Sequence, residues 1–535
     1  MLQKSKQIGI FCACTMLMTA WSGITNLASG AEDSNIFTDE TMTFEKIHGG
    51  VRIVDCAESV ATIIIPNEID GYPIREIGDS AFENCTKLRS VKIKSKMTSI
   101  GNGAFSNCVS LKEIEFPETL ESIGEAAFYA CSDLESLTIP ESVSSIGSYA
   151  FAYCISLESI ELPDKITELP SALFYYDIEL NDITLPQKLE HIDSMCIVGC
   201  HSIASIEIPS TVTEIEPAAI LSCAGLKEIN VDANNSVYRS DEKGVLYTAD
   251  GKTLLLYPAN NGVFNYQVPE TVKSIGEYAF ASSMTLETIT FPKSYTEVFP
   301  QGAFSDCAKL LSINCNPECL SEISSSLFAS CKQLQNLTLP DNCTAIGDYA
   351  FFECENLTEM TIPEKVSKIG KSAFCSCNRL TSLTIPDSVT EIGDNAVGYS
   401  IETDAENNEQ LVQRPDFIIR GRSGSAAKTF AKENGLTFKQ TNFDFKWLLI
   451  ALAVLAGIAA IALNAKRRNA AKKLASAAIE KVKRAPKPED EYDKNYESIL
   501  SETAEDENGD PFERSYGFSI DDDLEDMEED SDETT

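Results

Sequence analysis

A phenylalanine recurs every 23 residues along much of this chain, and the residues around it recur with it. The recurring position holds Phe82, Phe105, Phe128, Phe151, Phe174, Ile197, Ile220, Phe280, Phe304, Phe328, Phe351, Phe374 and Val397. A fixed period of about 20 to 50 residues is typical of a solenoid, in which each repeat buries its apolar side only against its neighbours. Because a solenoid lengthens without thickening its core, we predict one elongated domain from the repeats rather than several globular ones.

The repeat between Leu134 and Cys154 shows the pattern most clearly. Leu137 and Ile139 alternate with polar residues, as in a short strand with one buried face. The proline that follows the apolar pair ends the strand, since it lacks a backbone donor. The later glycine, Gly147 in this repeat, suits a turn that needs either positive φ or close backbone approach. Each repeat is therefore predicted to be a short strand followed by tight turns.

The motif Leu-x-x-Ile-x-Ile-Pro-x-x-Val-x-x-Ile-Gly-x-x-Ala-Phe-x-x-Cys resembles the BspA-like leucine-rich repeat family of bacterial cell-surface proteins. The resemblance covers about residues 55–440, where the motif returns thirteen times in near-fixed register. It implies a leucine-rich repeat solenoid of short parallel strands, turns and short helical segments, with about 13 repeats of 23 residues. It also implies display on a cell surface, either for adhesion or with no assigned role.

The repeats form two blocks, residues 55–230 and 269–400, after an N-terminal flank at 31–54. Aspartate and glycine stand between apolar runs in residues 231–268, so this insert is predicted to form β-hairpins. Residues 401–440 contain an expected strand and a short helix ended by glycine, which we interpret as a C-terminal cap over the open apolar end of the solenoid.

The remaining segments predict a single-pass membrane protein. Residues 1–30 have the basic, apolar and small-residue regions of a secretory signal peptide. Residues 447–463 lack charge and proline and are long enough for a short transmembrane helix. Residues 464–485 form a basic juxtamembrane helix, which places this side in the cytoplasm and the repeats outside. Residues 486–535 hold 21 acids and three bases, which predicts a disordered cytoplasmic tail.

The formal net charge is −39, and the repeats share in this acidity. Phosphate binding needs concentrated positive charge, so a nucleic-acid partner is excluded for the ectodomain.

Eighteen cysteines in an exported chain would ordinarily indicate disulfides, but their positions favour thiols. Where cysteine is missing from its usual place three residues after the phenylalanine position, Asp177, Ser283 or Ser400 stands there. Such a position is small and forms local hydrogen bonds, so we predict a column of buried thiols, with cross-links between neighbouring coils as the alternative. Cys315 and Cys319 lie outside the column and are either a disulfide or two thiols. The column comprises Cys85, Cys108, Cys131, Cys154, Cys200, Cys223, Cys307, Cys331, Cys354 and Cys377.

No pattern of catalytic chemistry is present. The three histidines, His48, His191 and His201, are scattered, and His191 takes the place of Ser145 in an earlier repeat, which predicts an exposed side chain. Metal-ligand spacing, a phosphate-binding glycine loop and a serine elbow are all missing from the sequence. We predict no enzyme activity, no cofactor and no metal site.

Two surfaces are candidates for ligand contact. The outward columns of the strands are polar and rich in hydroxyls, which fits either a contact face or a solvated face. Tyrosines predicted to be exposed gather near the phenylalanine turns at Tyr129, Tyr149, Tyr153, Tyr175 and Tyr176, and in the insert at Tyr238, Tyr247 and Tyr257. Inserts in repeat arrays often carry the binding face. We therefore predict Tyr238, Tyr247 and Tyr257 as ligand-binding residues.

The sequence thus predicts a non-catalytic cell-surface protein, anchored by one membrane span, that binds an extracellular protein or glycan. The alternative is a transmembrane sensor or envelope scaffold that acts through its acidic tail and a cytosolic partner.

Overall fold

The computed structural model describes residues 35–404, 408–441, 474–477 and 479–480. The predicted signal peptide, the span at 447–463 and the acidic tail at 486–535 lie outside the described residues, as does most of the segment 464–485. Contacts divide the chain into two units, Met1–Asn442 and Phe443–Thr535, and the described residues of the second unit are helical. No helix in the described part of the chain has both the length and the apolar character to cross a membrane.

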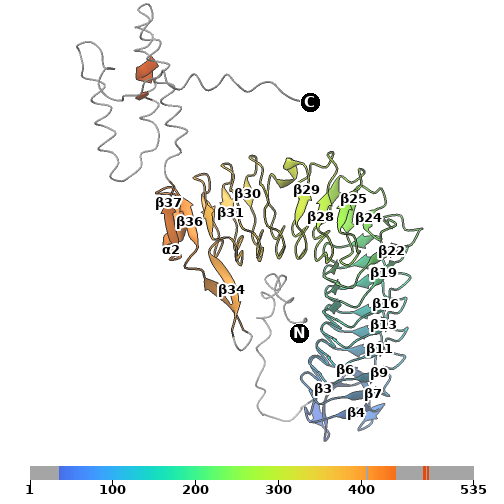
Figure 1. The fold of residues 1–535 in the computed structure, drawn as a ribbon. Helices are drawn as coiled ribbons and strands as arrows, with labels where there is room; N and C mark the ends of the chain where they lie inside the picture. Colours follow the sequence, from blue (N-terminus) through green and yellow to red (C-terminus); the bar gives the residue numbers. More distant parts are fainter. Residues whose placement is uncertain (1–34, 405–407, 442–473, 478, 481–535) are drawn as a thin grey trace, which may run out of the picture. The chain divides into compact units, whose positions relative to one another are not determined.

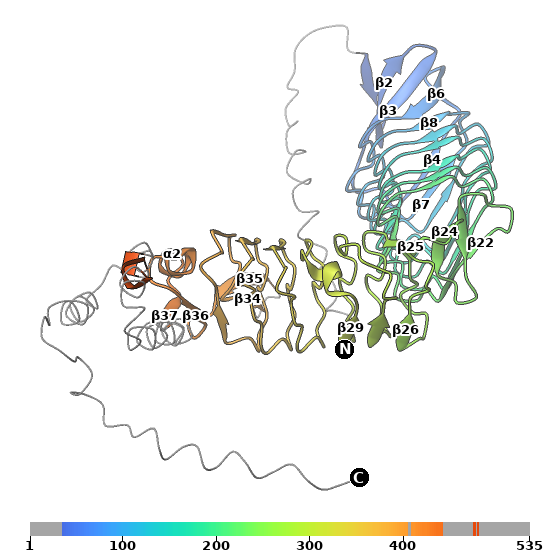
Figure 2. The same ribbon diagram turned by 90° about the horizontal axis from the view of Figure 1, so that it is seen from above.

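The predicted solenoid of short parallel strands is confirmed in the first unit (Figure 1). Successive coils pair in parallel with a shift of 23 residues, as in Ser136↔Ser159 and Ser122↔Ser145. Each regular coil contributes to two ladders of strands. The view in Figure 2 shows the coils stacked in chain order.

The first ladder follows the apolar pair of each repeat. Its strands are β4 (Thr62–Ile65), β7 (Ser90–Ile93), β9 (Glu113–Glu115), β11 (Ser136–Thr138), β13 (Ser159–Glu161), β16 (Asp182–Thr184), β19 (Ser205–Ile208), β22 (Glu228–Val231), β26 (Asn265–Gln267), β28 (Thr288–Thr290), β29 (Ser312–Asn314), β32 (Ser382–Thr384), β36 (Ile418–Gly421) and β37 (Thr437–Gln440). Inward side chains such as Leu137 are buried and their neighbours Ser136 and Thr138 are exposed, as the alternation predicted.

The second ladder follows the later isoleucine of each repeat. Its strands are β6 (Tyr72–Ile77), β8 (Ser99–Ile100), β10 (Ser122–Ile123), β12 (Ser145–Ile146), β14 (Glu168–Leu169), β17 (His191–Ile192), β20 (Glu214–Ile215), β25 (Thr253–Leu256), β27 (Ser274–Ile275), β30 (Ala345–Ile346), β31 (Lys368–Ile369) and β33 (Glu391–Ile392). At its N-terminal end β1 (Ile36–Thr38), β2 (Met42–Ile47) and β3 (Gly50–Cys56) pair antiparallel, β3 joins β6 in parallel, and β5 (Glu68–Ile69) pairs antiparallel with β6.

The recurring phenylalanines form a buried stack along the inside of the coils. The rings of Phe105 and Phe128 are nearly parallel, with centroids 5.2 Å apart and planes at 8°. The stack continues through Phe151 to Phe174, whose centroids are 6.0 Å apart. Because each ring is covered by rings of the coils on either side, a single repeat could not bury its own phenylalanine.

In most repeats the recurring phenylalanine lies in a turn, and the short helical segments that the family resemblance implied are few among the described residues. Left-handed residues stand two positions before and two after it, as Tyr149 (φ 59°) and Tyr153 (φ 62°) do around Phe151. A right-handed helix cannot continue through such residues, so the described repeats contain little helix. Within residues 35–404 and 408–441 the helices are a 3₁₀ turn at Pro317–Leu320 and α2 (Ala426–Glu433).

The recurring glycine serves close backbone approach and not positive φ. A Cβ on Gly124 would lie 2.6 Å from the backbone nitrogen of Asn102 in the preceding coil, and one on Gly147 would lie 2.4 Å from that of Glu125. The sequence allowed either positive φ or close backbone approach, and the structure shows close backbone approach.

The predicted column of buried thiols is confirmed. All ten column cysteines are free and buried. The thiol of Cys108 donates to the carbonyl oxygen of Phe82 at 3.0 Å, and that of Cys131 donates to Phe105 at 3.3 Å. Each such bond joins a thiol to the phenylalanine of the preceding coil. Cys315 and Cys319 are also free thiols.

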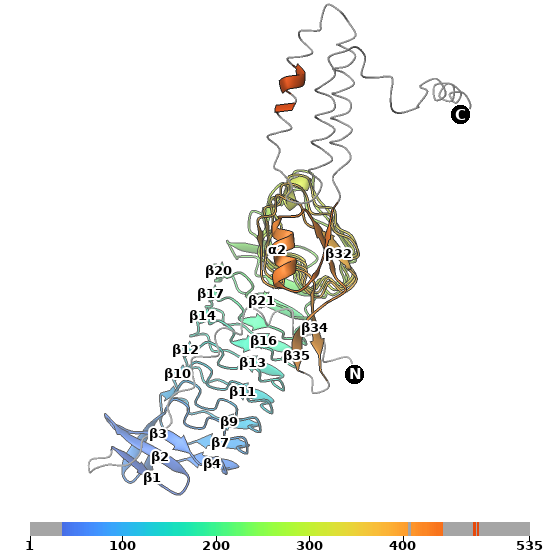
Figure 3. The same ribbon diagram turned by 90° about the vertical axis from the view of Figure 1, so that its left-hand side faces the viewer.

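The C-terminal part of the first unit leaves the repeat pattern. A hairpin of β34 (Tyr399–Thr403) and β35 (Glu409–Gln413) precedes β36. Helix α2 then packs on β36 and β37, and Figure 3 shows it beside the last strands. The buried side of α2 comprises Ala427, Phe430 and Ala431.

Candidate functional site

The three tyrosines predicted to bind a ligand are core residues, so the prediction that they are exposed was wrong. Tyr238 is 8% exposed, and Tyr247 and Tyr257 are each 1% exposed. The hydroxyl of Tyr247 lies 2.8 Å from that of Tyr266 and donates to Asp241 at 3.2 Å. Burial raises the pKa of Tyr247 above its usual value. Tyr247 thus belongs to a polar network with Tyr266 and Asp241, and none of the three predicted tyrosines presents an exposed ring.

The insert instead joins the two repeat blocks. Its strands β23 (Tyr238–Ser240), β24 (Leu246–Thr248) and β25 pair antiparallel, and β25 then joins β27 in parallel. Leu246 packs into the core of the first block, whereas its neighbours Val245 and Tyr247 pack into that of the second. The insert is therefore the element through which two separate apolar cores meet.

A second group of aromatic residues lies on the outside of the phenylalanine turns. We call Tyr129, Tyr149, Tyr153, Tyr175 and Tyr176 the tyrosine ridge. Tyr129, Tyr149 and Tyr153 are half-buried, whereas Tyr175 and Tyr176 are buried, so the sequence overestimated the exposure of the last two. Three residues keep accessible ring surface.

The ridge rings contact one another across successive coils. The ring of Tyr153 stands edge-on to Tyr129 at 5.3 Å and is stacked on Tyr176 at 5.8 Å. Tyr175 and Tyr176 are 4.9 Å apart. Burial, and then the nearby Tyr149, raise the pKa of Tyr129. Aromatic rings held in this way offer apolar faces with hydroxyl donors at their rims.

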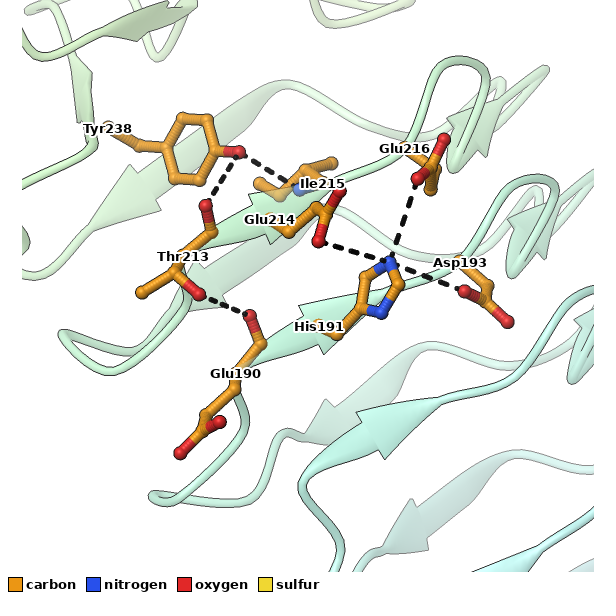
Figure 4. Close-up of polar contacts among 8 residues, drawn as sticks. All are labelled: Glu190, His191, Asp193, Thr213, Glu214, Ile215, Glu216 and Tyr238. Atoms are coloured by element: carbon orange, nitrogen blue, oxygen red, sulfur yellow. Dashed lines mark hydrogen bonds and ion pairs between the residues drawn. The ribbon is translucent and has the colours of Figure 1, made fainter.

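A third arrangement centres on His191, in the second ladder (Figure 4). Register places Glu168, His191 and Glu214 in one column, on β14, β17 and β20. His191 Nε2 lies 3.4 Å from Asp193 Oδ1, 3.8 Å from Glu216 Oε1 and 4.0 Å from Glu214 Oε2. We call these five residues the His191 cluster. Its donor atoms include two sets of three that lie within 4.8 Å of one another, and both sets contain His191.

The sequence reasoning missed this cluster, although a signal was present. Asp193 and Glu216 occupy the position that holds glycine in most repeats, which the 23-residue register makes visible. These coils also differ from the others in their strands. They carry an extra sheet of β15 (Phe174–Tyr175), β18 (Ile197–Val198) and β21 (Ile220–Leu221).

Tyr238 supports the backbone beside the cluster (Figure 4). Its hydroxyl accepts a hydrogen bond from the N–H of Ile215 at 2.9 Å and donates to the carbonyl of Thr213 at 3.4 Å. Ile215 stands between Glu214 and Glu216 in the chain. Tyr238 therefore fixes the strand from which both carboxylates project.

The outward side chains of the first ladder form polar columns. Ser90 donates to Glu113 at 2.9 Å, and Asn230 donates to Glu207 at 2.7 Å, each across one coil. These contacts between coils fit a solvated face as well as a contact face.

A family model for the BspA type leucine-rich repeat region matches the chain over residues 55–178, 123–241, 260–316 and 273–403. A search of curated proteins finds no match.

Solved structures with similar folds were also found. A leucine-rich cell surface protein from Faecalibacterium prausnitzii is 31% identical, and the match covers 66% of this chain and 95% of that protein, with a TM-score of 0.59. A leucine-rich repeat protein from Bacteroides ovatus is 24% identical, with 76% and 100% covered and a TM-score of 0.44.

Proposed function

Because the chain belongs to the BspA-type leucine-rich repeat family, whose structural neighbours include bacterial cell-surface proteins, we propose that it is a non-catalytic surface protein that binds a protein or glycan through the tyrosine ridge. Anchoring by the segment 447–463, with the repeats outside and the tail in the cytoplasm, is part of the same proposal. Residues 401–440 act in it as the cap of the solenoid.

The observation that carries the proposal is the ridge itself. A tyrosine that is half exposed and held by its neighbours loses little conformational freedom on binding, which is why such residues are common in binding surfaces. The ring of Tyr153 is in contact with Tyr129, Tyr175 and Tyr176, so it is held from three sides. Sugar rings and apolar side chains both pack on such faces.

The test uses the purified full-length chain in detergent, screened on a glycan array and in pull-downs of extracellular proteins. The variant Tyr129→Ser with Tyr149→Ser and Tyr153→Ser removes the accessible rings. A matched control, Glu113→Ser with Glu115→Ser, alters the exposed face of β9. We expect the ridge variant to lose a ligand that the control retains. A ligand lost only in the control would move the site to the strand face.

The alternative is a sensor or scaffold that acts through the acidic tail, and it is favoured by the 21 acids of residues 486–535. Truncation after Arg484 separates the two functions. If the chain is a surface binding protein, the truncated chain still binds its ligand. If it is a sensor or scaffold, the truncated chain loses that function.

A further inference from the structure

We propose that the His191 cluster binds a divalent transition-metal ion such as Mn²⁺ or Zn²⁺, which would tie two successive coils together near the end of the first repeat block. The proposed ligands are the imidazole Nε2 of His191 with carboxylate oxygens of Asp193, Glu214 and Glu216, and Glu168 stands on the coil before. The proposal is independent of ligand binding at the tyrosine ridge.

The spacing of the donor atoms is the first reason. Nitrogen and oxygen ligands lie about 2.0–2.2 Å from Zn²⁺. Two ligands of one ion are therefore separated by about 3.0 Å at a right angle and by about 3.4 Å at a tetrahedral angle. His191 Nε2 is 3.4 Å from Asp193 Oδ1 and 3.8 Å from Glu216 Oε1, so small side-chain rotations complete a site.

The state of the histidine is the second reason. His191 Nε2 is shielded from solvent and makes no hydrogen bond with any residue that the structure describes. A polar atom in that position costs free energy unless it has a partner. Figure 4 shows this nitrogen directed at the carboxylates of Asp193, Glu214 and Glu216. A metal ion between them gives it that partner.

The charge balance is the third reason. Four carboxylates surround one imidazole, and within residues 35–404 and 408–441 no lysine or arginine forms an ion pair with any of the four. Mutual repulsion of the carboxylates is relieved by a bound cation. A donor set of one imidazole and several carboxylates suits Mn²⁺ and Zn²⁺ better than Ca²⁺, which prefers oxygen alone.

The support of the site is the fourth reason. The Tyr238 hydroxyl bonds to the backbone on either side of Glu214, at Ile215 N–H and at the Thr213 carbonyl. Fixed backbone keeps the two glutamates in place before an ion arrives, and this lowers the cost of binding.

The experiment titrates the purified full-length chain with Mn²⁺, followed by electron paramagnetic resonance, and with Co²⁺, followed by its visible spectrum. The variants are His191→Ala and Glu216→Gln. Glu190→Gln is the matched control, because this neighbouring side chain is exposed and points away from the cluster (Figure 4). Circular dichroism checks that every variant is folded.

We expect one ion to bind the natural chain and the Glu190→Gln variant equally. Affinity should fall at least about ten-fold in His191→Ala and in Glu216→Gln, since each removes a ligand. The proposal is overturned by absence of Mn²⁺ and Co²⁺ binding to the natural chain, by equal binding in all four proteins, or by a Co²⁺ spectrum with thiolate charge-transfer bands that His191→Ala leaves unchanged.

Discussion

The hydroxyl of Tyr238 accepts a hydrogen bond from the backbone N–H of Ile215 at 2.9 Å. Ile215 belongs to β20, the last strand of its sheet before the insert. In the regular coils the equivalent backbone N–H faces the strand of the next coil. The insert takes the place of that strand beside β20, and the Tyr238 hydroxyl supplies the missing hydrogen-bond partner. A residue first interpreted as a ligand contact thus closes the edge of a sheet.

Replacing Tyr238 by phenylalanine should lower the free energy of unfolding by about 1–3 kcal/mol, because the Ile215 N–H and the Thr213 carbonyl lose their partner. Denaturant unfolding followed by circular dichroism measures the change. Tyr72→Phe is the control, since Tyr72 is 41% exposed, and it should be nearly neutral. An equal effect of the two substitutions would contradict the bracing role of Tyr238.

Removing one ring from the phenylalanine stack should be far more costly. Phe151 is fully buried between Phe128 and Phe174, so Phe151→Ala leaves a cavity between two coils and should cost about 3–5 kcal/mol. The control Phe264→Ala alters a side chain that is 51% exposed. Thermal unfolding of the three proteins provides the comparison, and a Phe151→Ala variant as stable as the control would show that the coils relax to fill the gap.

The thiol column should make the protein less stable in alkali. Burial, followed by the nearby Cys85, raises the pKa of Cys108 from 9.0 to about 12. Above pH 9 the unfolded chain loses this proton while the folded chain keeps it. The stability is therefore complete below pH 9 and falls as pH rises, by about 1.4 kcal/mol per pH unit for each such thiol.

Guanidinium unfolding at pH 8 and pH 10, under reducing conditions, measures this loss. In the double variant Cys108→Ser with Cys131→Ser the loss should be smaller, because serine does not titrate in this range. Identical pH dependence in the variant and the natural chain would mean that other groups cause the decline.

Asp177 stands in the cysteine column and should be a weak point of the first block. Its side chain is fully buried and accepts the Cys154 N–H at 2.7 Å, but its Oδ2 has no partner among the described residues. Burial raises the pKa of this carboxyl well above its usual value. The folded chain therefore holds a proton that the unfolded chain releases above about pH 4, and stability declines as pH rises from there.

Asp177→Ser places in the column a residue that it accepts elsewhere, at Ser283 and Ser400. We expect a gain of about 1–3 kcal/mol at pH 7 that shrinks toward pH 4, where the carboxyl is protonated in both states. Asp182→Ser, on the exposed side of β16, is the control and should change little. A gain that does not vary with pH would rule out burial of the carboxyl as its cause.

The sequence predicted the burial of a side chain correctly where the residue recurs from one repeat to the next, and wrongly where it lies in the insert. Leu137 inside, Thr138 outside and Cys154 in a buried column followed from position in the repeat, and all three were confirmed. Tyr238 and Tyr247 lie in the insert, where no register applies, and their burial was predicted wrongly. The polar composition of the insert suggested an exposed surface, but its tyrosines and leucines cover the apolar ends of the two repeat cores.

The sequence by itself determined the solenoid, the direction of its strands and the thiol column. Its period of 23 residues repeats the same local choices in every coil, and one coil can bury its phenylalanine only against the next. Only the tertiary structure decided that the insert tyrosines pack into the cores of the two repeat blocks, and that His191 lies beside Asp193 and Glu216. These outcomes depend on distances between side chains of different coils, which spacing along the chain does not specify.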